Sequence, residues 1–449
     1  MIPGRSRPAE VPLVRAVVVN FHGGDLTLAC LGSLLATEWP IERLEIVLVD
    51  NSAGDGVAET VRARHPQVRV LSSGANLGFA GGCNLGLTDL DQVEYVALVN
   101  NDATVAPDWL APLVAALASD SSLGAACPKI LFASSFLDVH VDSSTRVSGR
   151  GDRRALGVRL SGLRTAGADR FREAQFVDGF WDLEYGGAEE VRYRWTAGPA
   201  QLRVPVPLGG PVPECTHLRL AAPRPTPAVL RSPAGEVEVT VSTRPEWFGV
   251  PLGGEPYDVV NSAGSILVEG EYGADRGYLE PDRGQYDAPA DVEAWSGAAV
   301  LLARRYLDDV GRFDDRYFLY YEDFDLSWRG RARGWRYRYL PASVVRHVHS
   351  AASDEGSALF AFYNERNRLL TLARNADPRR AVTAPVRSLL VTGSYAVRDV
   401  VSPLLRAARP RPAIVAVRLR ALASFARLLP GTLSARRRRP GRPRQPSRR

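Results

Sequence analysis

Cysteine and lysine are scarce in this 449-residue chain, and long apolar runs are missing. The four cysteines lie far apart without a C-x-x-C pair, which argues against a zinc ribbon and a disulfide scaffold and fits a reducing cytosol. No run of roughly eighteen uncharged apolar residues predicts a transmembrane helix. Residues 1–11 lack the apolar centre of a signal peptide. With 45% hydrophobic and 24% charged residues, the sequence predicts a cytoplasmic protein that can bury a large core.

Positive charge is concentrated at the C-terminus. The net charge is +6, but the last twenty residues contain eight arginines and no acid, so the rest of the chain carries −2. Such a tail is typical of contact with an anionic membrane or nucleic acid, and equally of a solvated end. It lacks interleaved aromatic residues and any recognised nucleic-acid motif, so no nucleic-acid partner is expected. We expect residues 431–449 to be a disordered arginine-rich tail that contacts an anionic membrane surface.

Strand-like and helix-like patterns alternate between residues 14 and 131. The expected strands span residues 14–21, 45–50, 68–71 and 95–100. This alternation predicts parallel strands joined by right-handed helical crossovers. The polar residues that follow the strands then gather on one edge of the sheet; they are Asn20, Asp50, Asn76, Asn100, Asn101 and Asp102.

The fourth of these strands ends abruptly in Asn100-Asn101-Asp102. Ligands of open α/β sheets bind just beyond the carboxyl ends of the strands. A carboxylate there suits a hard cation, and a cation there suits a diphosphate. The alternative interpretation is an Asx turn that leads into a helix near Pro107.

The first strand–helix turn differs from that of a dinucleotide-binding fold, while the polar residues after the next two strands suit a ligand. Residues 20–25 read Asn-Phe-His-Gly-Gly-Asp, not G-x-G-x-x-G, which disfavours a nicotinamide enzyme. Asp50 can accept hydrogen bonds from a base or ribose, or simply cap its turn. The glycine-rich stretch 76–86 lets the backbone approach a ligand and suits anions at a helix start.

The sequence pattern changes in the middle of the chain, from alternating strands and helices to short β-like runs. Short alternating runs at residues 180–185, 191–195, 202–206 and 237–241 are separated by Pro and Gly clusters. This spacing predicts antiparallel β-structure arranged as a sandwich. α/β-like sequence resumes near Asp258, so this region looks inserted. Residues 412–430 are predicted to be helical without a clean amphipathic pattern.

Acids and histidines mark the second half. Glu322, Asp323 and Asp325 are interleaved with aromatic residues and are costly to bury without a role. If a helix begins at Asp325, that acid is structural, and Glu322 or Asp323 is left as a general base. His347 and His349 share one face of a strand, where they can pack or share a metal.

Taken in order, these motifs resemble those of family 2 glycosyltransferases, and especially of bacterial rhamnosyltransferases. The resemblance covers roughly residues 14–131 and 258–375 and includes the run from Trp295 to Ala298 and the run from Arg366 to Leu370. It implies a GT-A fold, an α/β architecture in which a nucleotide-binding half (12–133) and an acceptor half (258–380) share one sheet. We expect a β-sandwich-like insert at 134–257 and a helical, membrane-associating extension at 381–430. The resemblance assigns the insert no role.

The resemblance also implies residue roles. The donor-binding residues would be Asn20, Asp50, Asn76, Gly78, Phe79, Asn84, Asn100, Asn101 and Asp102. The acceptor-binding residues would be Trp295, Ser296, Gly297 and Ala298. Asp323, with Glu322 beside it, would be the catalytic base. Asp102 and His347, with His349 as fallback, would bind Mg²⁺ or Mn²⁺, although Asn-Asn-Asp departs from the family's D-x-D motif and leaves one certain carboxylate.

The expected reaction is inverting sugar transfer from a nucleotide diphosphate donor. The resemblance points first to dTDP-rhamnose, with UDP-galactofuranose or another UDP-hexose as alternatives. The acceptor would be a lipid-linked glycan or polysaccharide of the cell wall or surface, met at the inner face of the plasma membrane. A rival of another class is a non-catalytic glycan-binding protein that acts through the β-rich insert.

Overall fold

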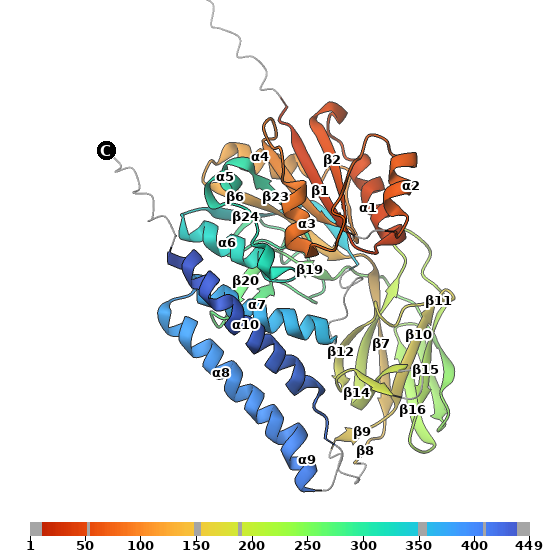
Figure 1. Ribbon diagram of the computed structural model, residues 1–449. Helices are drawn as coiled ribbons and strands as arrows, with labels where there is room; N and C mark the ends of the chain where they lie inside the picture. The colour runs from red at the N-terminus through yellow and green to blue at the C-terminus, as the bar shows by residue number, and fades with distance from the viewer. Residues whose placement is uncertain are drawn as a thin grey trace, which may run out of the picture. The chain divides into compact units, whose positions relative to one another are not determined.

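A computed structural model describes residues 11–51, 54–147, 154–186, 191–348, 357–406 and 410–437 (Figure 1). The chain forms two compact units. One comprises the chain up to Leu131 and from Val260 onwards, and the other is Phe132–Val259. His349 and the tail beyond residue 437 lie outside the described residues, so the fallback metal ligand and the tail are not described.

Four parallel strands form one side of the first unit's sheet. They are β1 (Val14–Asn20), β2 (Leu44–Asp50), β3 (Arg69–Ser72) and β4 (Tyr95–Asn100), with α1 (Gly24–Leu35), α2 (Val57–Arg64) and α3 (Gly78–Gly86) between them. Each strand lies within one residue of its predicted bounds. The prediction of alternating strands and helices is confirmed. Apolar runs bounded by polar turns are compatible with few structures other than buried strands.

The same sheet continues into the second half of the chain. Its order is β22-β24-β6-β23-β4-β1-β2-β3, and β23 runs antiparallel to both β4 and β6. The added strands are β6 (Leu123–Phe132), β22 (Ala290–Val292), β23 (Ala299–Ala303) and β24 (Arg336–His347). β24 is one twelve-residue strand, longer than its sequence pattern suggests. A single mixed sheet therefore carries both predicted halves.

Glycines in α3 allow this helix to lie close to the sheet. A Cβ added at Gly86 would lie 2.4 Å from Val17 Cγ1, and one at Gly82 would lie 2.6 Å from Val19 Cγ1. Both distances are shorter than any real contact, so only glycine fits at these two positions. Part of the glycine-rich pattern thus serves helix–strand packing.

The second unit is an antiparallel sheet ordered β17-β16-β7-β14-β10-β15-β18. These strands are β7 (Ser135–Ser143), β10 (Arg159–Thr165), β14 (Val191–Val206), β15 (Cys215–Ala221), β16 (Thr226–Ser232), β17 (Gly235–Val241) and β18 (Glu246–Pro251). The two ends of the path, β17 and β18, contact each other, and Ser232 Oγ of β16 donates to the Pro251 carbonyl of β18 at 2.6 Å. The sheet thus folds over its own apolar core, as the sandwich-like prediction requires.

Two details of the insert differ from expectation. Residues 191–195 and 202–206 belong to one long strand, β14, and are not separate runs. Residues 181–183 are not a strand and lie between β12 (Gln175–Phe180) and β13 (Glu184–Gly186). Alternation alone does not show where a strand bends or continues.

Helices dominate the C-terminal region. After β24 come α7 (Ala358–Asn375), α8 (Pro378–Ala396), α9 (Ser402–Leu405) and α10 (Ala413–Arg437). α10 begins one residue after the predicted start at 412 and extends seven residues beyond the predicted end at 430. Among the described residues, no helix combines the length and apolar character needed to cross a bilayer.

Candidate active site

Three polar side chains meet at the carboxyl edge of the parallel strands. The register pairs Asn20 with Asp50 and Val19 with Asn100. Asp50 is buried, with an exposed fraction of 9%, and its Oδ1 accepts from Asn20 Nδ2 at 3.5 Å. The topology therefore gathers these strand ends on one edge, as the alternation of strands and helices predicts.

Asn20 organises the first turn. Its Oδ1 accepts from the Gly23 amide (3.1 Å) and from Thr27 Oγ1 (2.8 Å), while its Nδ2 donates to Asp55 Oδ2 (2.9 Å). Asn101 Nδ2 donates to the same threonine oxygen at 3.1 Å. Both asparagines shape the turn through these contacts, and their contact with a donor stays a prediction.

The start of α3 is fixed by two asparagines and one glycine. Asn76 Oδ1 accepts from the Gly78 amide at 2.8 Å, and Asn51 Nδ2 donates to the Gly78 carbonyl at 2.9 Å. Gly78 has φ +69°, and a Cβ there would lie 2.3 Å from the Phe318 carbonyl oxygen. Glycine is therefore needed at this position for both conformation and space.

Asn84 and Phe79 connect α3 to the acceptor half. Asn84 Nδ2 donates to Asp315 Oδ1 (2.6 Å) and to the Phe313 carbonyl (3.0 Å), and its Oδ1 accepts from the Phe313 amide (3.1 Å). Phe79 packs edge-to-face on Phe313. These contacts occupy the Asn84 amide, so its predicted donor contact has no support in this geometry.

Asp102 and His347 form a pair that suits a cation. His347 Nε2 lies 3.0 Å from Asp102 Oδ1, and Asn261 Oδ1 lies 3.0 Å from His347 Nδ1. The amide oxygen only accepts, so Nδ1 carries the proton and donates. Nε2 and the carboxylate then face each other, and Asn100 Nδ2 lies 3.4 Å from the same nitrogen. An imidazole oriented through its second nitrogen is the usual arrangement of a metal-bound histidine.

Strand pairing brings these two residues together. β5 (Ala103–Val105) pairs with the end of β24, setting Ala103 opposite His347, and the Val348 amide donates to the Asp102 carbonyl at 3.0 Å. Within the described part of the chain no cluster of three or more His, Cys, Asp or Glu side chains is placed to hold a metal ion. Of these residue types, the part of the chain that the structure describes brings Asp102 and His347 together here.

The segment before α6 (Glu322–Ala332) adopts an unusual backbone. Phe318, Tyr320 and Tyr321 have φ of 64°, 68° and 68°, in the left-handed region that side chains other than glycine rarely occupy. Such conformations cost free energy and persist only where surrounding contacts fix them. The helix therefore begins at Glu322, three residues before the predicted Asp325.

α7 supplies those contacts. Asn367 Nδ2 lies 2.8–2.9 Å from the carbonyls of Tyr317, Leu319 and Tyr320. Its neighbour Arg366 donates to the Tyr317 carbonyl at 2.7 Å. The turn before α6 is thus held to α7 by side-chain hydrogen bonds from α7 to the carbonyls of the turn.

Asp323 is a half-buried carboxylate with backbone partners only. Its Oδ2 accepts from the Gly297 amide at 2.8 Å, and its Oδ1 accepts from the Phe324 amide at 2.7 Å. Burial raises the pKa of Asp323 to about 6, against these two hydrogen bonds, which lower it, and with a smaller raising contribution from Asp275. A carboxylate with a pKa near 6 is mostly ionised at neutral pH and basic enough to take a proton from a hydroxyl.

Glu322 is more deeply buried than Asp323, with an exposed fraction of 5%. Its Oε2 has no hydrogen-bond partner among the described residues. Burial, and then the neighbouring Asp323 carboxylate, raise the pKa of Glu322 well above its usual value. Burial and these two acids also raise the pKa of the Cys83 thiol. Glu322 is therefore suited to remain a neutral acid beside an ionised Asp323.

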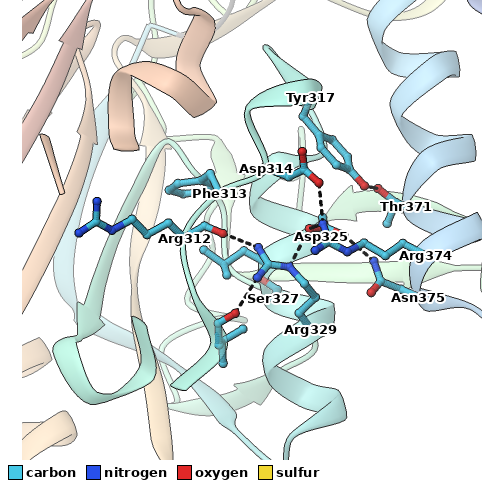
Figure 2. Close-up of polar contacts among 12 residues, drawn as sticks. Arg312, Phe313, Asp314, Tyr317, Asp325, Ser327, Arg329, Thr371, Arg374 and Asn375 are labelled. Carbon is cyan, nitrogen blue, oxygen red and sulfur yellow. Dashed lines mark hydrogen bonds and ion pairs between the residues drawn. The ribbon is translucent and has the colours of Figure 1, made fainter. Parts of the chain in front are cut away.

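Asp325 is fully buried and paired (Figure 2). Its Oδ2 accepts from Arg329 Nε (2.8 Å) and Arg374 Nη1 (3.0 Å), and its Oδ1 accepts from Asn375 Nδ2 (2.7 Å). Arg374 also donates to Asp314 Oδ2 at 2.9 Å. Asp325 thus joins α6 to α7, which agrees with the structural role expected from the sequence.

The predicted acceptor-binding run needs one correction. Trp295 is fully buried and packs edge-to-face on Phe313, so its indole supports the site from within and is not available to an acceptor. Ser296 is partly exposed. Gly297 donates to Asp323, and the Ala298 carbonyl accepts from the Asn100 amide at 2.9 Å. This run therefore links the strand edge to the acid.

Sequence reasoning missed two residues of this site. Asn261 orients His347, and Asn367 ties down the turn before α6. Asn261 follows two valines, a polar end to an apolar run like that of β4, but in too short a run to stand out. Asn367 belongs to the Arg-Asn-Arg run that supports the family resemblance, without a local pattern that shows its role.

A family comparison decides the identity of the nucleotide-binding half. Residues 16–149 match the family described as "Glycosyl transferase family 2". The chain therefore contains a family 2 glycosyltransferase domain. It is therefore an enzyme, and the rival of a non-catalytic glycan-binding protein is set aside.

Curated relatives of this glycosyltransferase come from Mycobacterium tuberculosis. In strains CDC 1551 / Oshkosh and ATCC 25618 / H37Rv, a protein named N-acetylglucosaminyl-diphospho-decaprenol L-rhamnosyltransferase is 25% identical over 402 residues, covering 88% of this chain and 95% of the relative. Similarity to a rhamnosyltransferase therefore extends over most of the chain.

Solved structures resemble this glycosyltransferase more distantly. A mannosyltransferase from Pyrobaculum calidifontis, solved with GDP-Man and Mn²⁺, matches with a TM-score of 0.40 and 14% identity over 94% of this chain and 88% of that one. GalNAc-T7, solved with UDP, GalNAc and Mn²⁺, matches with a TM-score of 0.41 and 14% identity over 82% of this chain and 48% of that one. Scores at this level carry no argument about ligands.

Proposed function

We propose that the chain is an inverting glycosyltransferase that moves a sugar from a nucleotide diphosphate donor to a lipid-linked or polysaccharide acceptor in cell-wall or surface glycan synthesis. Rhamnose from dTDP-rhamnose is the first choice. The name of the mycobacterial relatives supports both the sugar and a lipid-diphosphate acceptor. Galactofuranose or another hexose from a UDP-sugar is the alternative.

One observation carries the proposal. The Asn100 amide at the end of β4 donates to the Ala298 carbonyl, and the amide of the preceding residue, Gly297, donates to the Asp323 carboxylate. This bridge ties the strand edge, where a donor diphosphate is expected, to a carboxylate whose pKa is raised to about 6. A donor site and a base held by one backbone segment are what a single displacement needs.

In the proposed step, Asp323 accepts the proton of the acceptor hydroxyl while that oxygen forms a bond to the anomeric carbon. The bond from this carbon to the diphosphate oxygen breaks at the same time, and the nucleoside diphosphate leaves. One base suffices, because the diphosphate is a good leaving group that needs no acid. Attack from the face opposite the diphosphate inverts the anomeric configuration.

The residues present fit a divalent cation. Asp102 and His347 are two acceptors at 3.0 Å, with the second imidazole nitrogen held by Asn261. When bound, Mg²⁺ or Mn²⁺ would neutralise the departing diphosphate. The imidazole favours Mn²⁺, and carboxylate oxygen suits either ion. The remaining ligands would come from the donor diphosphate and water.

A lipid-linked acceptor would place this enzyme at a membrane. We propose a peripheral location on the inner face of the plasma membrane, where an anionic lipid surface is a partner. The basic C-terminal region supports this location, because juxtamembrane arginines are attracted by anionic headgroups.

A transfer assay tests the proposal. The purified full-length chain is incubated with Mn²⁺, a polyprenyl-diphosphate-linked N-acetylglucosamine acceptor, and dTDP-rhamnose, UDP-galactofuranose or UDP-glucose in parallel. We expect a rhamnosylated product by mass spectrometry and inverted configuration by NMR. Transfer from a UDP-sugar alone would overturn the choice of rhamnose. Retained configuration would overturn the single displacement.

A further inference from the structure

α8 buries its small and polar side chains and exposes its large apolar ones, the opposite of the usual arrangement in a water-soluble protein. It packs against α7 and α10 (Figure 1). The residues it buries there are small or polar: Ala384, Ser388 and Thr392, each at most 3% exposed. A helix that stabilises a core normally buries its large apolar side chains. The apolar surface of α8 therefore does not serve the packing of this unit.

Large apolar side chains lie on the opposite face. Leu390 is 69% exposed and Leu405 is 83% exposed. Together with their exposed neighbours at spacings of mostly three and four residues, they form what we call the outer stripe: Val382, Val386, Leu389, Leu390, Val397, Val401, Leu404 and Leu405. Exposed apolar patches of this extent mark interaction surfaces.

Polar contacts fix which face of α8 points inward. Ser388 Oγ donates to Glu365 on α7, and Arg418 Nε on α10 donates to Thr392 Oγ1 at 3.1 Å. Arg387 donates to the buried Glu271 at 3.2 Å. Rotating the helix to bury the outer stripe would break these contacts and leave buried charges unpaired. The exposure of the stripe is therefore built into the fold.

The sequence around the outer stripe is strongly basic. Residues 378–437 contain twelve arginines and a single acid, Asp399. That acid is paired with Arg398 at 2.7 Å. Two copies that met through this stripe would bring like charges together, which disfavours a symmetric dimer. An anionic surface complements the charge.

We propose that the outer stripe is a membrane-docking surface. Its apolar side chains enter the headgroup region of an anionic bilayer, and the surrounding arginines contact lipid phosphates. This inference rests on the proposed function, because an enzyme with a lipid-linked acceptor must reach that acceptor at a membrane surface. It also narrows the membrane association expected of residues 381–430 to one face of α8 and α9.

Vesicle co-sedimentation of the full-length chain tests the proposal. Leu390 and Leu404 are both more than half exposed, so L390D/L404D should fold. The matched control is I41D, because Ile41 is 63% exposed in a different part of the same unit. We expect binding to phosphatidylglycerol vesicles, weak binding to phosphatidylcholine vesicles, and at least a tenfold loss for L390D/L404D but not for I41D.

Two outcomes would overturn the proposal. One is equal vesicle binding by wild type and L390D/L404D, with loss only on deletion of residues 438–449. The other is a dimer in analytical ultracentrifugation that L390D/L404D converts to monomer, which would assign the stripe to a second copy. Neither readout involves sugar transfer, so the docking surface and the proposed reaction can fail independently.

Discussion

The carboxyl edge of the parallel strands and the first turn of α6 are both polar, but they satisfy their polar groups in opposite ways. At the strand edge, Asn20 and Asn101 share their hydrogen bonds with a threonine and with backbone amides. In the first turn of α6, Glu322 and Asp323 form no salt bridge with any described residue.

This difference in hydrogen bonding separates the polar groups that stabilise the site from those that are available for reaction. Neutral amides donate and accept at once, so neighbouring amides can satisfy one another. A carboxylate only accepts, and without a cation its burial raises its pKa. Asp325 shows the contrast within one helical turn, since two arginines and an asparagine pair with it fully.

The largest expected effect comes from removing the unpaired base. D323N should lower kcat by about 10²- to 10⁴-fold, because the amide cannot take a proton. Donor binding, measured by isothermal titration with a nucleoside diphosphate and Mn²⁺, should stay within a factor of a few. Near-normal turnover would show that the base lies elsewhere.

Removing the paired acid, Asp325, should lower the stability of the fold more than the rate of the reaction. D325A leaves Arg329 and Arg374 without a shared partner, which should cost about 3–5 kcal/mol of unfolding free energy. Urea denaturation measures this loss. If D325A instead kept its stability and lost only turnover, the assignment of a structural role to Asp325 would fail.

At the strand edge, N261A should release the imidazole of His347. Loss of such an orienting partner typically weakens metal binding by about 10- to 100-fold. Mn²⁺ titration in the presence of nucleoside diphosphate measures the change. Unchanged Mn²⁺ affinity would show that the Asp102–His347 pair does not bind the ion.

The smallest effect is the pH dependence. Because Asp323 must be ionised to act as base and its pKa is about 6, kcat/KM should rise with pH through about 6 and fall roughly tenfold per unit below it. E322Q should keep this acid limb, since Glu322 is expected to be neutral throughout. A limb that moved or vanished in E322Q would instead assign the titration to Glu322.

Local patterns predicted the sheet well. Apolar runs such as residues 95–100 leave little choice of structure, and topology then places Asn20, Asp50 and Asn100 on one edge. The same patterns did not show that Trp295 is buried, because a motif gives order along the chain and not exposure.

Other features depend on contacts distant in sequence. The start of α6 at Glu322 requires Asn367, which lies on another helix. The orientation of α8 was equally hidden, because an amphipathic pattern does not say which face meets the protein. Ser388 and Thr392 are buried only because α7 and α10 offer polar partners.

The left-handed turn before α6 has a consequence for the design of more stable variants. Phe318, Tyr320 and Tyr321 each hold a backbone conformation that glycine would adopt without strain, at a cost of about 1 kcal/mol or more per residue. Here aromatic rings occupy positions where backbone energetics alone would choose the smallest residue. Glycine at Tyr320 would relieve this strain but remove the ring that packs edge-to-face on Phe360, so the change in melting temperature would measure the balance between the two.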